Sequence, residues 1–99
     1  MKVYFERTGG FAALRTSISL DTDLMPPGES DKLKAMFENA NFFNLPQKYE
    51  AKEGADYFHY KITLETKENK HTVETTDLSM TPMLESIVNF LSNKVQSEK

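Results

Sequence analysis

The order of hydrophobic patterns along the chain predicts an α+β fold. We expect a four-stranded, mostly antiparallel sheet made of two hairpins, with two helices packed on one face. Extended runs occur in two pairs, each pair around a turn signal, and a helical apolar stripe follows each pair. The 99 residues, 38% of them hydrophobic, are enough for one core and leave no room for a second. The chain is therefore predicted to be a single domain, residues 1–99, with the order ββαββα.

The first hairpin is predicted from two extended runs, residues 2–8 and 11–21, around a glycine pair. With Gly9-Gly10 as a two-residue loop, Phe5 lies opposite Leu14. One side of both strands is then apolar and the other mostly polar, which is typical of an antiparallel sheet with one face in water.

The first helix is expected to begin near Ser30, after the break at Pro26-Pro27. Apolar residues then recur at i, i+3, i+4 and i+7, the spacing of one helix face: Leu33, Met36, Phe37 and Ala40. Phe42 and Phe43 follow the helix, and we expect both to close the core.

The second half of the chain repeats this pattern without repeating the sequence. Strict alternation predicts a strand over residues 56–66, and a turn at Glu68-Asn69 places Val73 opposite Leu64. Thr81-Pro82 is typical of a helix start, with threonine as the N-cap and proline in the first turn. The expected buried stripe of this helix is Leu84, Ile87, Val88, Leu91 and Val95.

Composition excludes several classes of protein. The 12 basic residues are outnumbered by 15 acidic ones, which gives a net charge of −3 and argues against a nucleic-acid partner. There is no cysteine, hence no disulfide, thiolate nucleophile or cysteine-based zinc site. No apolar run is long enough to span a membrane, and Glu6 and Arg7 stand where a signal peptide is apolar. We therefore expect a cytoplasmic protein without a membrane partner.

Catalytic and metal-binding patterns are also missing. The predicted strands place His59 on the wet side and His71 on the core side, so the two histidines do not share an ion. Gly9-Gly10 precedes a strand and not a helix, so it is not a phosphate cradle. Methionines 25, 36, 80 and 83 fit core filling better than a small-molecule carrier. We predict no enzyme activity, no cofactor and no metal.

A protein partner remains, and two segments are candidates for its contact. The hairpin tip Thr8-Gly9-Gly10-Phe11-Ala12 combines a bare backbone with one aromatic side chain, although Gly-Gly is also simply a good turn. The acidic stretch that contains Asp21 and Asp23 is the second candidate. Its alternative interpretation is a solvated loop leading into the N-terminal end of a helix, where acids are favoured.

Several motifs together resemble the emfourin family, bacterial protein inhibitors of protealysin and related thermolysin-like zinc metalloproteases. The resemblance extends from residue 3 to the final helix. Its motifs are Val3-Tyr4-Phe5-Glu6-Arg7-Thr8-Gly9-Gly10-Phe11-Ala12, Asp21-Thr22-Asp23, Pro26-Pro27, Phe42-Phe43, Leu45-Pro46, Phe58-x-Tyr60-x-Ile62-Thr63 and His71-Thr72-Val73.

The resemblance implies a reversible inhibitor, monomeric when free, that occludes the substrate cleft of a thermolysin-like metalloprotease with a hairpin tip or loop. It implies that Phe11, flanked by Gly9 and Gly10, fills the apolar pocket beside the zinc of the enzyme. An acid from the loop of Asp21 and Asp23 would approach the metal region. The alternative is a non-catalytic interaction module that pairs an exposed sheet edge with a partner strand.

Overall fold

Two hairpins and two helices alternate along the chain in the predicted order. The computed structural model describes residues 1–9, 15–47, 58–76 and 81–97. The strands are β1 (Lys2–Gly9), β2 (Thr16–Asp21), β3 (Phe58–Glu65) and β4 (Lys70–Thr76). The helices are α1 (Pro27–Asn39) and α2 (Pro82–Ser97), and two short 3₁₀ turns are η1 (Thr22–Leu24) and η2 (Phe42–Asn44). The ββαββα order of the prediction is confirmed.

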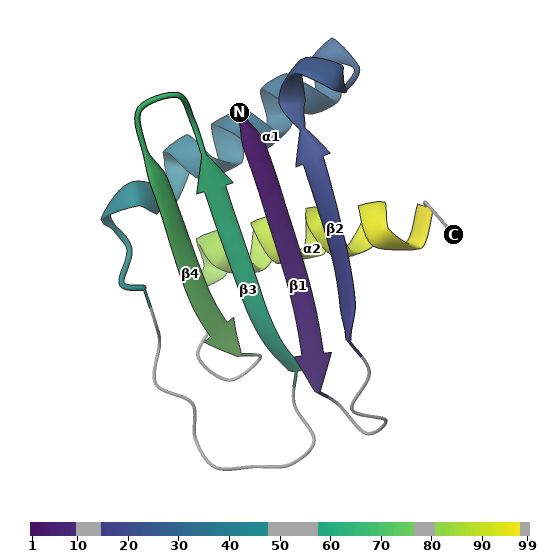
Figure 1. Ribbon diagram of the computed structural model, residues 1–99, viewed down its shortest axis with the longest axis vertical. Helices are drawn as coiled ribbons and strands as arrows, with labels where there is room; N and C mark the ends of the chain where they lie inside the picture. The colour runs from purple at the N-terminus through teal and green to yellow at the C-terminus, as the bar shows by residue number, and fades with distance from the viewer. Residues whose placement is uncertain (10–14, 48–57, 77–80, 98–99) are drawn as a thin grey trace.

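The strands form one sheet in the order β2-β1-β3-β4, and all neighbours are antiparallel. The first strand of the chain is therefore central, with one hairpin partner on one side and the second hairpin on the other (Figure 1). This leaves β2 and β4 as the two edges of the sheet.

The register of the first hairpin differs from the prediction. Phe5 lies opposite Ile18, and Val3 lies opposite Leu20. The predicted partner of Phe5, Leu14, is outside the described residues. The shift is four residues, because the connection between the strands is longer than the Gly9-Gly10 turn that the sequence indicates.

The register of the second hairpin is also wrong, by two residues. Val73 lies opposite Ile62 and not Leu64. The turn lies one residue earlier than predicted, at Lys67-Glu68 instead of Glu68-Asn69, because Thr66 pairs with Asn69 and donates its amide to the Asn69 carbonyl oxygen at 2.8 Å. Both shifts are even numbers, so every side chain stays on its predicted face of the sheet.

The residues at the ends of the two helices are types that are favoured at helix termini. Helix α1 begins at Pro27, three residues before Ser30, and proline is well suited to the first turn. After its end, Asn41 takes the left-handed conformation (φ 53°) that closes many helices. In front of α2, the Thr81 hydroxyl oxygen accepts from the Leu84 amide at 3.3 Å, which confirms the predicted N-cap.

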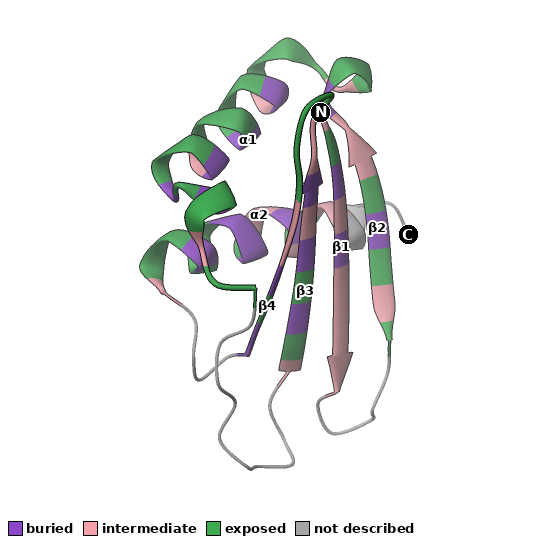
Figure 2. Cartoon of the chain, turned by 60° about the vertical axis from the view of Figure 1, so that its left-hand side comes forward, coloured by how far each residue is buried: buried purple, intermediate pink, exposed green. Residues whose placement is uncertain are grey.

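Both helices cover the same face of the sheet, and the core lies between them and the strands (Figure 2). Phe42 is buried as predicted and contacts Phe37 edge-on, with ring centroids 5.0 Å apart. Phe43 does not close the core, because its side chain is 38% exposed. Met25 and Met36 pack against the core, whereas Met83 is exposed.

No helix within the described part of the chain covers the opposite face of the sheet (Figure 1). We call this surface, made by the outward-facing side chains of the four strands, the open face. It is the face turned to the viewer in Figure 1. Among the described residues, no helix is long and apolar enough to cross a membrane.

Candidate functional site

The hairpin tip is only partly within the described residues. Thr8 and Gly9 end strand β1, where they lie opposite His59 and Phe58 of β3. Gly9 has a φ of 97°, a conformation that side chains of L-residues rarely adopt, so a glycine is required there. The other tip residues of the prediction, Gly10, Phe11 and Ala12, lie outside the described residues.

The two predicted contact segments lie at opposite ends of the sheet. Asp21 pairs with Lys2 at the first residue of β1, whereas Thr8 lies near the other end of that strand. Six residues of strand separate Lys2 from Thr8, which corresponds to about 20 Å. The tip and the acidic segment therefore cannot contact the same point of a partner.

The acidic segment is a short, firmly held turn. An Asp21 carboxylate oxygen accepts from the Asp23 amide at 3.0 Å, and the Met25 amide donates to the carbonyl oxygen of Thr22. The side chain of Thr22 is only 3% exposed, and its amide donates to the carbonyl oxygen of Met1 at 2.9 Å. The Thr22 hydroxyl donates to the same oxygen at 3.2 Å. This turn is thus tied to Met1, the residue that precedes the central strand.

The turn carries the most exposed large apolar side chain of the described residues. Leu24 is 85% exposed, between the carboxylate of Asp23 and the half-buried Met25. An isolated exposed leucine needs no explanation, but this one stands on a rigid turn beside two acids. Sequence reasoning missed it, although an apolar residue inside an acidic stretch and before Pro26-Pro27 was the available signal.

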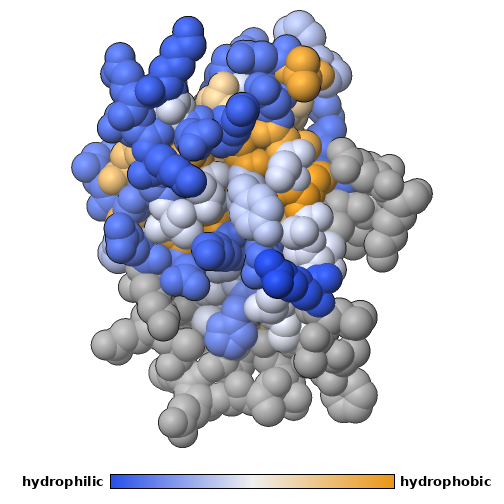
Figure 3. Space-filling model, viewed as in Figure 1, coloured by the Kyte–Doolittle hydropathy of each residue, from blue (hydrophilic) through white to orange (hydrophobic). Residues whose placement is uncertain are grey.

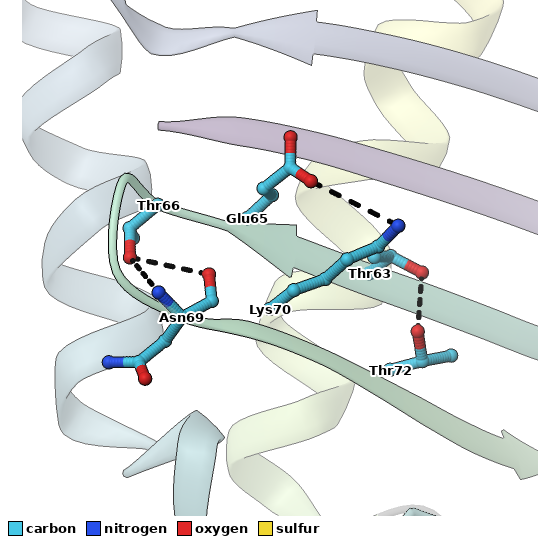
Figure 4. A network of polar contacts seen from close by, with 6 residues as sticks. All are labelled: Thr63, Glu65, Thr66, Asn69, Lys70 and Thr72. Carbon is cyan, nitrogen blue, oxygen red and sulfur yellow. Dashed lines mark hydrogen bonds and ion pairs between the residues drawn. The ribbon is translucent and has the colours of Figure 1, made fainter.

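The open face is striped by rows of side chains that run across the strands. The row next to the η1 turn alternates in charge: Asp21, Lys2, Glu65 and Lys70. Opposite charges on neighbouring strands attract each other, and the Lys70 ammonium lies 4.0 Å from the Glu65 carboxylate (Figure 4).

The next row consists of hydroxyl side chains: Ser19, Tyr4, Thr63 and Thr72. The Thr63 and Thr72 hydroxyls share a hydrogen bond of 2.9 Å across β3 and β4 (Figure 4). A shallow hollow of about 670 Å³ lies over the two rows, with Leu20 and Leu24 in its wall. Figure 3 shows hydrophobic surface among hydrophilic side chains at this end of the open face.

Glu6, two residues further along β1 than Tyr4, makes the shortest ion pair of the open face among the described residues. The Tyr4 hydroxyl donates to Glu6 at 2.9 Å, and the Arg15 guanidinium donates to the same oxygen at 2.8 Å. These hydrogen bonds, with that from Tyr4 contributing most, lower the pKa of the Glu6 carboxyl below its ordinary value. The contact also raises the pKa of the Arg15 guanidinium.

The two histidines lie apart, as the strand pattern predicts. His59 is exposed on the open face, opposite Thr8 and Thr76. His71 faces the helices and donates from Nε2 to the carbonyl oxygen of Leu45 at 2.8 Å. Within the described parts of the chain, no three histidine, aspartate or glutamate side chains are grouped so as to hold a metal ion.

Comparison with known proteins gives one match. The sequence model of the Emfourin family matches residues 5–92, which include all elements except the first three residues of β1 and the end of α2. The chain belongs to the emfourin family. No curated protein and no solved structure matches it. Except for Val3 and Tyr4, the emfourin match covers the motifs from which the family resemblance of the sequence was drawn.

Proposed function

We propose that this emfourin-family protein is a reversible inhibitor of thermolysin-like zinc metalloproteases. The observation that carries the proposal is the family match over residues 5–92, because the family is one of protease inhibitors. The same match supports a protein that has no enzymatic activity of its own. We further propose that it acts in the cytoplasm as a monomer that binds one protease molecule.

Two features of the fold suit an inhibitor that blocks a cleft. The η1 turn offers Leu24 as an apolar anchor, with Asp21 and Asp23 as acids beside it. The turn is fixed by Thr22 and Met1, so little conformational entropy is lost when a partner binds it. A turn held in this way also resists the unfolding that a protease needs before it can cut.

The hairpin tip of Thr8 to Ala12 stays the second proposed contact segment. Thr8 and Gly9 lie at the other end of the sheet from the η1 turn. The tip and the η1 turn are therefore alternative proposals for the segment that enters the cleft. The emfourin match includes both segments and does not choose between them.

The function is tested by titrating the purified protein into protealysin and, in parallel, thermolysin. Peptide hydrolysis is followed after preincubation at several inhibitor ratios, with the serine protease subtilisin as the control. We expect stoichiometric loss of metalloprotease activity and unchanged subtilisin activity. Full metalloprotease activity at large excess, with the protein recovered uncut, would contradict the proposal. Rapid cleavage of the protein would make it a substrate.

A further inference from the structure

The two edge strands of the sheet, β2 and β4, differ in whether hydrogen bonds reach their outer side. On the β4 edge, the Glu74 amide donates to the carbonyl oxygen of Gln47 at 2.8 Å, and His71 bonds the nearby Leu45 carbonyl. The segment that follows α1 therefore covers part of this edge. On β2, no hydrogen bond among the described residues reaches the outer edge of Thr16–Asp21.

The register identifies which backbone groups of β2 point outward. The Thr22 amide donates to the carbonyl oxygen of Met1, so this pair, which continues the β1–β2 register, is hydrogen-bonded. Hydrogen-bonded and non-hydrogen-bonded pairs alternate in an antiparallel ladder. The N–H and C=O groups of Ser17, Ser19 and Asp21 therefore point away from β1. The same alternation on β4 places the Glu74 amide outward, where its bond to Gln47 is found.

Nothing among the described side chains of β2 guards this edge. Natural edge strands are commonly protected by lysine, proline or a bulge, and Thr16–Asp21 contains neither of these residues. The side chains of Ser17 and Ser19 are small and exposed on the open face. Helix α2 packs against β2 and continues past it behind the sheet (Figures 1 and 2). A strand added beside β2 would thus find backbone partners at its side and a helix behind it.

We infer that the β2 edge accepts an extended segment of the target protease as a fifth strand, which rests on the proposed inhibitory function. The charge row on the open face specifies the chemistry of that segment. Because the row alternates as Asp21, Lys2, Glu65 and Lys70, the residue opposite Asp21 is expected to be lysine or arginine. Residues opposite Ile18 and Leu20 face α2 and are expected to be apolar.

A second copy of this chain fits the edge less well. Antiparallel pairing of two β2 strands requires a two-fold axis perpendicular to the sheet, which keeps the helices of both copies on the same side. Helix α2 extends past β2 on that side (Figure 1), so both copies of the helix would need the space behind the junction. A single extended segment of another protein brings no second copy of α2, so it does not compete for this space.

The inference is tested with Ser19→Pro, which removes one outward N–H without removing a hydrogen bond to β1. Ser19→Thr is the matched control, because it changes the side chain and keeps the amide. We expect the inhibition constant for protealysin to rise about tenfold for Ser19→Pro, as for the loss of one or two hydrogen bonds, and about twofold or less for Ser19→Thr. Circular dichroism and thermal unfolding check that both variants are folded.

Hydrogen exchange of the unmodified protein gives a readout that does not depend on a proline variant. In the complex with protealysin inactivated at its catalytic residue, we expect slower exchange at the amides of Ser17, Ser19 and Asp21. Unchanged exchange, or a folded Ser19→Pro protein that inhibits as well as the unmodified one, would overturn the inference and leave the inhibitory function standing. Slower exchange on raising the concentration of the free protein would assign the edge to a second copy. Failure of the unmodified protein to inhibit would instead refute the proposed function.

Discussion

Leu24 and Thr22 are two residues apart and have opposite environments. Leu24 is almost entirely in solvent, whereas Thr22 is buried and hydrogen-bonded to Met1. Truncation of Leu24 therefore tests binding, and a change at Thr22 tests how the turn is held. Within this one turn, Leu24 is available for contact with a partner, and Thr22 holds the turn in position.

For Leu24→Ala, we expect the inhibition constant for protealysin to rise by about ten- to a thousandfold, as for an anchor residue at an interface. The midpoint of thermal unfolding should be nearly unchanged, because the side chain has little contact with its own protein. Phe43→Ala, a second partly exposed apolar residue on η2, is the control. If Phe11→Ala weakens inhibition and Leu24→Ala does not, the hairpin tip is the contact.

For Thr22→Val, we expect the free energy of unfolding to fall by about 1–2 kcal/mol. The substitution keeps the shape of the side chain but leaves the backbone of Met1 without its hydroxyl partner. Thr22→Ser keeps the hydroxyl and should lose less. Urea unfolding of the three proteins measures the difference, and equal stability of Thr22→Val and the unmodified protein would show that the hydroxyl contributes nothing.

Glu6 gives a pH-dependent prediction. Its pKa is lowered from 4.5 in the folded protein, chiefly by the Tyr4 hydroxyl. A carboxyl with a lowered pKa stabilises the folded state above its unfolded pKa, and this stabilisation is lost as the pH falls through the folded pKa. We expect Tyr4→Phe to move the pKa of Glu6 upward in an NMR titration. A pKa that does not move would show that the Tyr4 hydroxyl does not lower it.

At the scale of elements, the sequence predicted which side chains lie together on each face but not which residues face each other. Alternation determines the face of every strand residue, and that information survives an even shift. The turn determines the register, and β2 begins at Thr16, later than a two-residue turn at Gly9-Gly10 predicts. Phe5 therefore keeps its place in the core while its partner changes from Leu14 to Ile18.

The η2 turn contains two adjacent aromatic residues whose burial the sequence pattern could not predict. Sequence predicted that Phe42 and Phe43 both close the core, but only Phe42 points into it, against Phe37 and His71. Nothing in the local pattern distinguishes the two, because η2 is too short for a helical or strand period. Asn41 suits the end of a helix from its sequence alone, but its left-handed conformation, which precedes η2, does not distinguish Phe42 from Phe43 in advance.

Phe42→Ala is expected to lower the free energy of unfolding by about 3–5 kcal/mol, because it leaves a cavity among fully buried side chains. Phe43→Ala should lower it far less. Chemical denaturation of the two variants makes a matched pair, since the residues are neighbours of the same type. Similar losses for both would place Phe43 in the core after all.

At the scale of the whole molecule, the candidate site was predicted in part. The acids Asp21 and Asp23 were singled out from sequence, and they border the most exposed leucine of the described residues. Their distance from Thr8 was not foreseen, because it depends on the strand length that separates the two ends of β1. The open edge of β2 depends on sheet order, which no local pattern contains.

The free protein is expected to sediment as a monomer over a wide range of concentrations. The open face balances positive and negative side chains, the overall charge of −3 opposes self-association, and α2 obstructs pairing of two β2 edges. Sedimentation velocity measures this directly. A concentration-dependent dimer would contradict the argument about α2.

The central place of β1 governs how this protein folds during synthesis. β1 pairs with β2, which follows it closely, and with β3, which is made much later: Val3 lies opposite Leu64. Non-local pairings of this kind slow folding, because a long loop must close before they contribute. Until β3 leaves the ribosome, the first hairpin and its η1 turn have no second sheet partner. An isolated two-stranded hairpin is marginally stable at best in water, so the turn that presents Leu24 is expected to be stably held only after β3 has paired with β1.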